Sequence, residues 1–145
     1  MGGQPSARPG TRLTRSSHLG DLEVQRVGDT GPVVIALHGM SSSPAILREW
    51  DGCAEACALQ GFQVWLPNFH SNGRAAPSWG CSEQVRLVEE LVASAEEVIL
   101  MGKSWGGALA AKAARRAGVR GLVLVCPALA KAELAKEPWP KPCWE

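Results

Sequence analysis

Residues 98–107 have the sequence Val-Ile-Leu-Met-Gly-Lys-Ser-Trp-Gly-Gly, and this stretch decides the fold. Its first four residues are apolar and predict a buried strand, while the alanine-rich stretch from about 106 to 117 predicts a helix. Ser104 lies between the two in the pattern G-x-S-x-G, with Gly102 and Gly106 on either side. Small flanking residues allow a serine to occupy a strained strand-to-helix turn with its hydroxyl exposed, and Gly107 allows the helix to pack closely under that turn. Ser104 is therefore a candidate nucleophile.

The rest of the chain alternates in the same way around this turn. Apolar-polar alternation predicts a strand at residues 22–27, and apolar stretches predict strands at 33–37, 62–67, 98–101 and 122–126. Helices are expected at about 44–60, from Ser82 onward, and at about 106–117. Strands that alternate with helices favour right-handed crossovers. The sequence predicts a three-layer α/β/α fold with a mostly parallel sheet of about five strands.

A second loop, His38-Gly39-Met40, follows the central strand 33–37 and precedes a helix. This loop resembles the H-G-x loop of the α/β-hydrolase superfamily. The motif at Ser104 follows it in the chain order and structural context of that family. The resemblance covers about residues 22–130. It implies that Ser104 is the nucleophile and that the backbone N–H groups of Met40 and Trp105 form the oxyanion hole. His38 is expected to order this loop through hydrogen bonds.

The resemblance also implies an activity and an order of the strands in the sheet. It implies hydrolysis of a small carboxylic ester, thioester or amide substrate by acyl transfer to Ser104, with no metal or organic cofactor. The implied sheet has the strand at 22–27 on one side, followed by 62–67, 33–37, 97–101 and 121–126. In this family the acid and the histidine of the triad follow the nucleophile along the chain.

Those two triad members are missing after Ser104. The acids that follow Pro127 are Glu133, Glu137 and Glu145, and no histidine follows. We therefore expect residues 21–145 to be an incomplete α/β-hydrolase domain, truncated relative to its family, with weak or no activity. His70 is a candidate base, although it lies two strands from Ser104, at roughly 10 Å before the side chains reach.

Two alternatives to a working hydrolase follow from the same residues. The last strand would be an exposed sheet edge, so the chain could be a non-catalytic module that binds a ligand or pairs with a partner strand. Gly102-Lys103-Ser104 also matches the end of a nucleotide-binding P-loop. That pattern needs a glycine at position 97, where the chain has Glu97 before an apolar strand.

Composition excludes several other classes. Fifteen basic and fourteen acidic residues give a net charge of +1, so no strong field favours nucleic acid. The five cysteines lack the clustered spacing of a metal site, and no apolar stretch is long enough to span a membrane. Residues 1–20 contain arginines and no acid, which indicates a disordered leader or an organelle transit peptide. With the leader interpretation, we expect a cytoplasmic protein.

Overall fold

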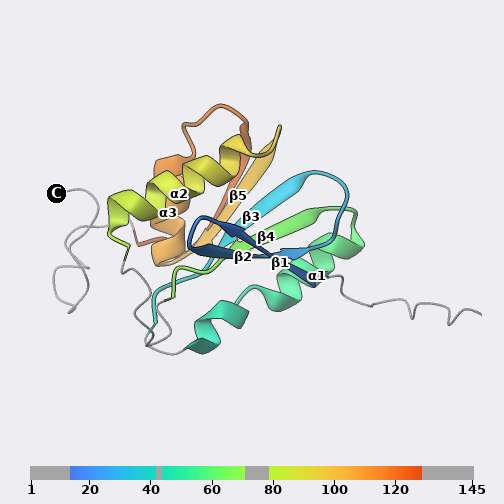
Figure 1. The fold of residues 1–145 in the computed structure, drawn as a ribbon, viewed down its shortest axis with the longest axis horizontal. Helices are drawn as coiled ribbons and strands as arrows, with labels where there is room; N and C mark the ends of the chain where they lie inside the picture. The colour runs from blue at the N-terminus through green and yellow to red at the C-terminus, as the bar shows by residue number, and fades with distance from the viewer. Residues whose placement is uncertain (1–13, 42–43, 71–78, 129–145) are drawn as a thin grey trace, which may run out of the picture.

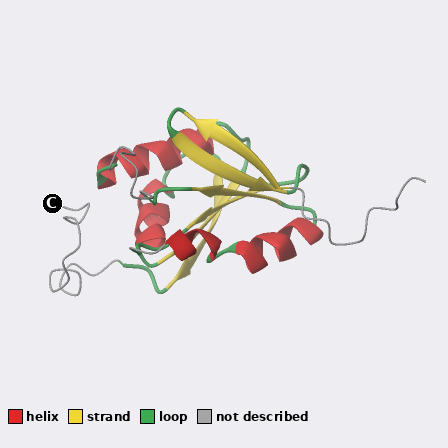
Figure 2. Ribbon diagram, turned by 60° about the horizontal axis from the view of Figure 1, so that its bottom comes forward, coloured by secondary structure: helices red, strands yellow, loops and turns green. Residues whose placement is uncertain are grey.

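The computed structural model describes residues 14–41, 44–70 and 79–128. They form a six-stranded sheet. Helices cover both faces of this sheet (Figures 1 and 2). The strands, in chain order, are β1 (Thr14–Leu19), β2 (Leu22–Val27), β3 (Val33–Leu37), β4 (Gln63–Pro67), β5 (Val98–Lys103) and β6 (Val119–Val125). Their order in the sheet is β1-β2-β4-β3-β5-β6. The strands from β3 onward are parallel, and β1 and β2 run antiparallel to their neighbours. The predicted three-layer architecture and the order of the five predicted strands are confirmed.

The sixth strand was not predicted. Residues 14–19 were assigned to a disordered leader, yet they form β1, which pairs with β2 from Thr14↔Val27 to Leu19↔Leu22. Gly20 makes the turn between the two strands with a φ of 57°. The leader interpretation is therefore wrong for residues 14–19, whose polar composition suits an edge strand. Residues 1–13 and 129–145 lie outside the described part of the chain.

The predicted helix at 44–60 is in fact two helices. A 3₁₀ helix, η1 (Pro44–Arg48), is followed by α1 (Asp51–Leu59), with a turn at Glu49 and Trp50 between them. The indole Nε1 of Trp50 donates to the carbonyl of Leu37 at 3.0 Å, at the end of the central strand. This buried contact anchors the turn between the two helices to the sheet.

Two apolar layers fill the space between sheet and helices. Side chains alternate along the central strand, so that Val33, Ile35 and Leu37 face one layer and Val34 and Ala36 face the other. The first layer is covered by α2 (Cys81–Ala93) and α3 (Trp105–Ala113), and the second by η1 and α1. Burial on both faces explains why these strands are apolar without alternation.

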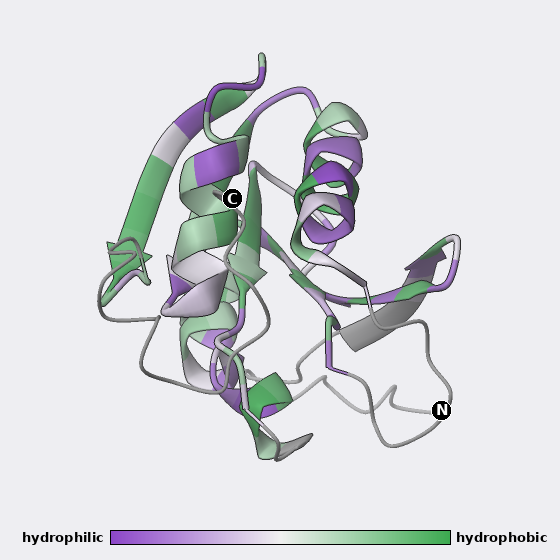
Figure 3. Cartoon of the chain, turned by 90° about the vertical axis from the view of Figure 1, so that its left-hand side faces the viewer, coloured by the Kyte–Doolittle hydropathy of each residue, from purple (hydrophilic) through white to green (hydrophobic). Residues whose placement is uncertain are grey.

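The outer strand β6 leaves apolar side chains in solvent. Leu122, Val123 and Val125 are 41%, 45% and 38% exposed. Figure 3 shows β6 at the outer edge of the sheet, with most of its length coloured as hydrophobic. The exposed edge that the sequence predicts is present among the described residues. Among all the described residues, no helix is both long enough and apolar enough to cross a membrane.

The packing of Gly106 gives a first testable prediction. A Cβ on Gly106 would collide with the carbonyl oxygens of Leu37 and His38, which are backbone atoms that cannot easily move. We expect Gly106→Ala to lower the free energy of unfolding by about 1–3 kcal/mol, measured by urea denaturation with circular dichroism. Gly52→Ala is the matched control, because nothing lies within 4 Å of a Cβ at this helical position. That control should raise stability by up to about 1 kcal/mol, and equal effects of the two changes would contradict the prediction.

Candidate active site

Ser104 occupies the turn between β5 and α3 with a backbone that is rare for a residue other than glycine. Its φ and ψ are 52° and −116°, and its side chain is partly exposed. Three hydrogen bonds hold this turn: Ser104 N donates to Val125 O at 3.0 Å, while the carbonyl of Ser104 accepts from Ala108 N at 3.2 Å and Ala128 N at 2.9 Å. The strained turn predicted from G-x-S-x-G is therefore present, and the surrounding backbone supports it.

The glycines of the motif are required by close backbone contacts. A Cβ on Gly102 would collide with the carbonyl of Gly106, and a Cβ on Gly107 would lie 2.8 Å from the Cβ of Pro127. Gly106 itself packs against the end of β3. These contacts allow the first turn of α3 to lie directly against two strand ends, which brings Ser104 to the carboxyl edge of the sheet.

His38 follows β3 at this same edge and is held by two hydrogen bonds. Its Nδ1 lies 2.7 Å from the carbonyl oxygen of Gly39, and its Nε2 accepts from the backbone N–H of Phe69 at 3.0 Å. The second bond assigns the proton to Nδ1, so the imidazole is neutral and donates to Gly39. Burial lowers the pKa of His38 below its ordinary value, against the opposing effects of the Gly39 hydrogen bond and of Glu49; His70 lowers it further. The predicted ordering role of His38 fits this geometry.

The loop at residues 38–40 lies directly against the serine turn. A Cβ on Gly39 would stand 3.5 Å from the carbonyl oxygen of Lys103 and 3.6 Å from the Cβ of Ser104. This proximity follows from the parallel pairing of β3 with β5, in which Leu37 is opposite Gly102. Among the described residues, no backbone carbonyl of another turn or loop accepts the N–H of Met40 or Trp105.

Sequence reasoning missed two side chains that support this region. Glu49 accepts a hydrogen bond from the backbone N–H of Gly39 at 2.9 Å and pairs with the ammonium of Lys103 at 2.6 Å, and this contact raises the pKa of Lys103. Gln84, buried on α2, accepts from the indole of Trp105 at 3.0 Å. No pattern marks either residue, because polar side chains on an amphipathic helix are expected to face solvent.

His70 does not follow the strand next to Ser104. It comes after β4, and β3 lies between β4 and β5 in the sheet. Its backbone N–H donates to the side-chain oxygen of Asn68 at 2.9 Å, and its imidazole disfavours the charged form of His38. The role of His70 as a base remains a prediction.

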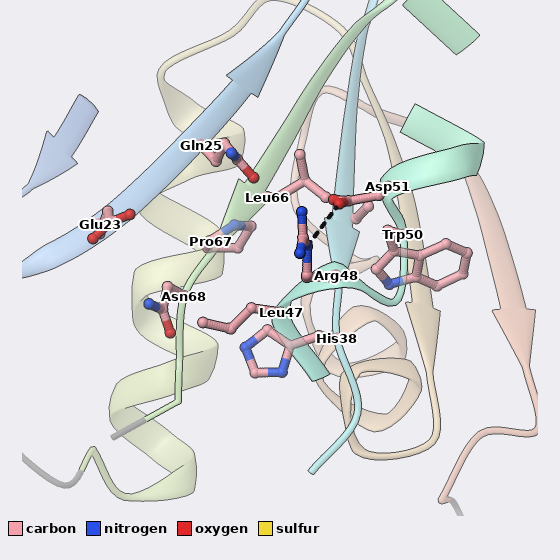
Figure 4. A pocket seen from close by; sticks show the side chains of 11 residues that line it. Glu23, Gln25, His38, Leu47, Arg48, Trp50, Asp51, Leu66, Pro67 and Asn68 are labelled. Carbon is pink, nitrogen blue, oxygen red and sulfur yellow. Dashed lines mark ion pairs between the residues drawn. The ribbon is translucent and has the colours of Figure 1, made fainter. Parts of the chain in front are cut away.

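A cavity of about 400 Å³ opens beside His38 on the face covered by η1 and α1 (Figure 4). Ala36, Trp50 and Leu66 give it an apolar floor. Its rim is polar and includes an ion pair of 3.5 Å between Arg48 and Asp51. The volume is that of a small-molecule site.

No group of three or more His, Cys, Asp or Glu side chains that could hold a metal ion occurs among the described residues.

Comparisons with known proteins give the family of the chain and relatives of its fold. Residues 33–144, most of the chain, match the model of the alpha/beta hydrolase family. No curated protein matches the sequence. The fold is similar to that of a thioesterase domain from the curacin biosynthetic pathway, with 22% identity and a TM-score of 0.64 over 81% of this chain and 47% of that one.

Two other solved structures have the same fold. One is epoxide hydrolase A from Mycobacterium thermoresistibile, with 21% identity and a TM-score of 0.62 over 79% of this chain and 39% of that one. The other is a serine hydrolase involved in carbazole degradation, with 19% identity and a TM-score of 0.66 over 85% and 51%. The chain spans about half the length or less of these three structures. With its family match, its strand order and its serine turn, the chain belongs to the alpha/beta hydrolase family.

Proposed function

We propose that this chain carries the nucleophile half of a serine hydrolase that cleaves a carboxylic ester, thioester or amide through Ser104. The observation that carries the proposal is the backbone of Ser104, a non-glycine residue at a φ of 52° on a strand-to-helix turn. Strain of this kind persists where surrounding contacts enforce it, and it is concentrated at functional sites. The contact of this turn with Gly39 supports the same interpretation, because a catalytic serine needs an oxyanion site beside it.

The oxyanion site is proposed to consist of the backbone N–H groups of Met40 and Trp105. The carbonyl of Gly39 and the N–H of Met40 belong to one planar trans peptide, so they point in opposite directions. The hydrogen bond from His38 to the Gly39 carbonyl therefore directs the Met40 N–H away from His38. The N–H of Trp105 is at the first residue of α3, where backbone N–H groups lack helical partners and favour negative charge.

In the proposed reaction, the Ser104 oxygen bonds to the substrate carbonyl carbon while its proton passes to a base. The carbonyl oxygen becomes an oxyanion, and when it collapses the alcohol, thiol or amine leaves with that proton. Water then hydrolyses the acyl-enzyme by the same steps. Acyl transfer of this kind needs neither a metal nor an organic cofactor. His70 is the candidate base within these 145 residues, where no histidine follows it. We therefore expect slow turnover by this chain, not the rate of a complete triad.

A fluorophosphonate probe tests the nucleophile, because it reacts with an activated serine whatever the natural substrate is. We expect the 145-residue chain to be labelled slowly and the Ser104→Ala variant not to be labelled. Intact-protein mass spectrometry measures the labelling. Ser94→Ala is the control, since the Ser94 hydroxyl donates to Leu91 O at the end of α2, outside the site. A folded wild-type chain that resists the probe, or a Ser104→Ala variant that still reacts, would refute the proposal for this chain.

The burial of His38 predicts a pH dependence of stability. Because the folded pKa of His38 is below its ordinary value of 6.5, the fold favours the neutral imidazole. The preference for the neutral imidazole stabilises the fold fully above pH 6.5. This stabilisation is lost as the pH falls through 6.5 toward the folded pKa. The free energy of unfolding in urea should therefore fall more in the wild type than in His38→Asn between about pH 7.5 and 5.5. His18→Gln, an exposed control, should keep the wild-type dependence, and the same dependence in His38→Asn would show the idea to be wrong.

The exposed edge of β6 favours a second candidate function, a non-catalytic module that pairs with a partner strand. An apolar edge strand presents unpaired N–H and C=O groups that another chain can extend. Leu122, Val123 and Val125 make this edge apolar as well as open. Under this alternative, Ser104 would be a structural residue of the turn.

Charge on the edge strand tests this alternative. We expect the wild-type chain to associate as its concentration rises and Val123→Lys to stay monomeric, because a lysine on an edge strand opposes strand pairing. Size-exclusion chromatography with light scattering measures the difference. Leu59→Lys is the matched control, since Leu59 is a 68% exposed apolar residue on α1, away from the edge. If both substitutions change association equally, general surface hydrophobicity and not β6 is responsible.

A further inference from the structure

The carboxylate of Glu49 joins the two loops of the candidate active site. One oxygen accepts the N–H of Gly39 at 2.9 Å, and the other lies 2.6 Å from the ammonium of Lys103, the residue immediately before Ser104. The Glu49 side chain is only 12% exposed, whereas that of Lys103 is 45% exposed. A mostly buried carboxylate therefore holds a more exposed ammonium and a backbone N–H at the same time.

The break between η1 and α1 is what places Glu49 there. Its own N–H donates to Ile46 O at 3.1 Å, which closes the 3₁₀ turn, and the next residue, Trp50, donates from its indole to Leu37 O at 3.0 Å. Consecutive side chains from one turn thus bind the end of β3 and the loop that follows it. A continuous helix over the same residues would direct them about 100° apart around its axis, away from this shared target.

Glu49 and His38 together fix two successive peptides of the loop. Glu49 binds the N–H of Gly39, in the peptide that joins His38 to Gly39, and His38 binds the carbonyl of Gly39, in the next peptide. Each peptide is planar, so both orientations are set by these side chains. The second peptide carries the N–H of Met40 in the proposed oxyanion site.

The charge balance explains why a lysine accompanies this carboxylate. An unpaired negative charge beside an oxyanion would oppose the charge that develops there. Among the described residues, the ammonium of Lys103 pairs with Glu49 and the imidazole of His38 lies near it, and because that imidazole is neutral the ammonium supplies the compensating charge. Lys103 thus neutralises the carboxylate and ties it to the turn that carries Ser104.

We propose that Glu49 is a positioning residue that sets the Gly39–Met40 peptides against the Ser104 turn, with Lys103 as its neutralising partner. The proposal rests on the function proposed above for Ser104. It assigns Glu49 no contact with the substrate, and it predicts separate roles for its hydrogen bond and its charge.

Amide hydrogen exchange measured by NMR on the 145-residue chain tests the hydrogen bond without any need for activity. In the wild type, Gly39 should exchange more slowly than Met40, because Glu49 accepts only the Gly39 N–H. Glu49→Ala should abolish this difference, and Glu49→Gln should keep it because the amide oxygen still accepts. Glu55→Ala, at an exposed position on α1, removes the same charge and should change nothing. Equal exchange of Gly39 and Met40 in the wild type would overturn the proposal even if a variant failed to fold.

Fluorophosphonate labelling then tests the consequence for Ser104. Glu49→Ala should label about 10- to 100-fold more slowly than the wild type, because a displaced loop misplaces the oxyanion donor. Glu49→Gln should recover most of the labelling rate. Lys103→Met should still be labelled slowly, because the charge of the Glu49 carboxylate is no longer compensated. Labelling at one rate in all four proteins would overturn the positioning role. If the wild type is not labelled while Gly39 exchange responds to Glu49→Ala as expected, the proposed function fails and the Glu49 contact stands.

Discussion

The close approach of α3 to the end of β3 is the constraint on which the candidate site depends. Gly106 lies against the carbonyl oxygens of Leu37 and His38, and Gly102 lies against the carbonyl of Gly106, so no side chain separates these backbones. This contact places the serine turn and the His38–Met40 loop side by side at one edge of the sheet. Parallel strands make it available, because the carboxyl ends of β3 and β5 meet at the same edge.

Backbone proximity alone does not orient the peptides, and polar side chains supply that orientation. His38 bridges the loop to the backbone after β4 through Phe69, and Glu49 bridges it to the serine turn through Lys103. Both side chains are largely removed from water, where a hydrogen bond is stronger and an unmade one costs more than in solvent. Three segments distant in sequence are therefore held in one arrangement around Ser104.

The two edges of the sheet differ in how they meet solvent. At one edge, the polar strand β1 pairs with β2 and covers it, and Arg26 of β2 lies 4.2 Å from the ring of Trp65. At the other edge, β6 exposes Leu122, Val123 and Val125. An apolar strand at an open edge is the kind of strand that another chain can extend, so the second candidate function is proposed from the same strand order that builds the serine turn.

The sequence by itself determined the layer architecture and the turn at Ser104, because these follow from local patterns, whereas the strand order was implied by the resemblance to the α/β-hydrolase superfamily. A four-residue apolar stretch before G-x-S-x-G specifies a buried strand and its sharp exit. Only the tertiary structure decided the break at Glu49, the pairing of Glu49 with Lys103 and the strand β1. Glu49 and Lys103 are separated along the chain by several elements, and the polar sequence of residues 14–19 lacks the apolar alternation that indicates a strand. Which polar side chain meets which backbone group depends on the packing of the whole sheet, and no local pattern carries that information.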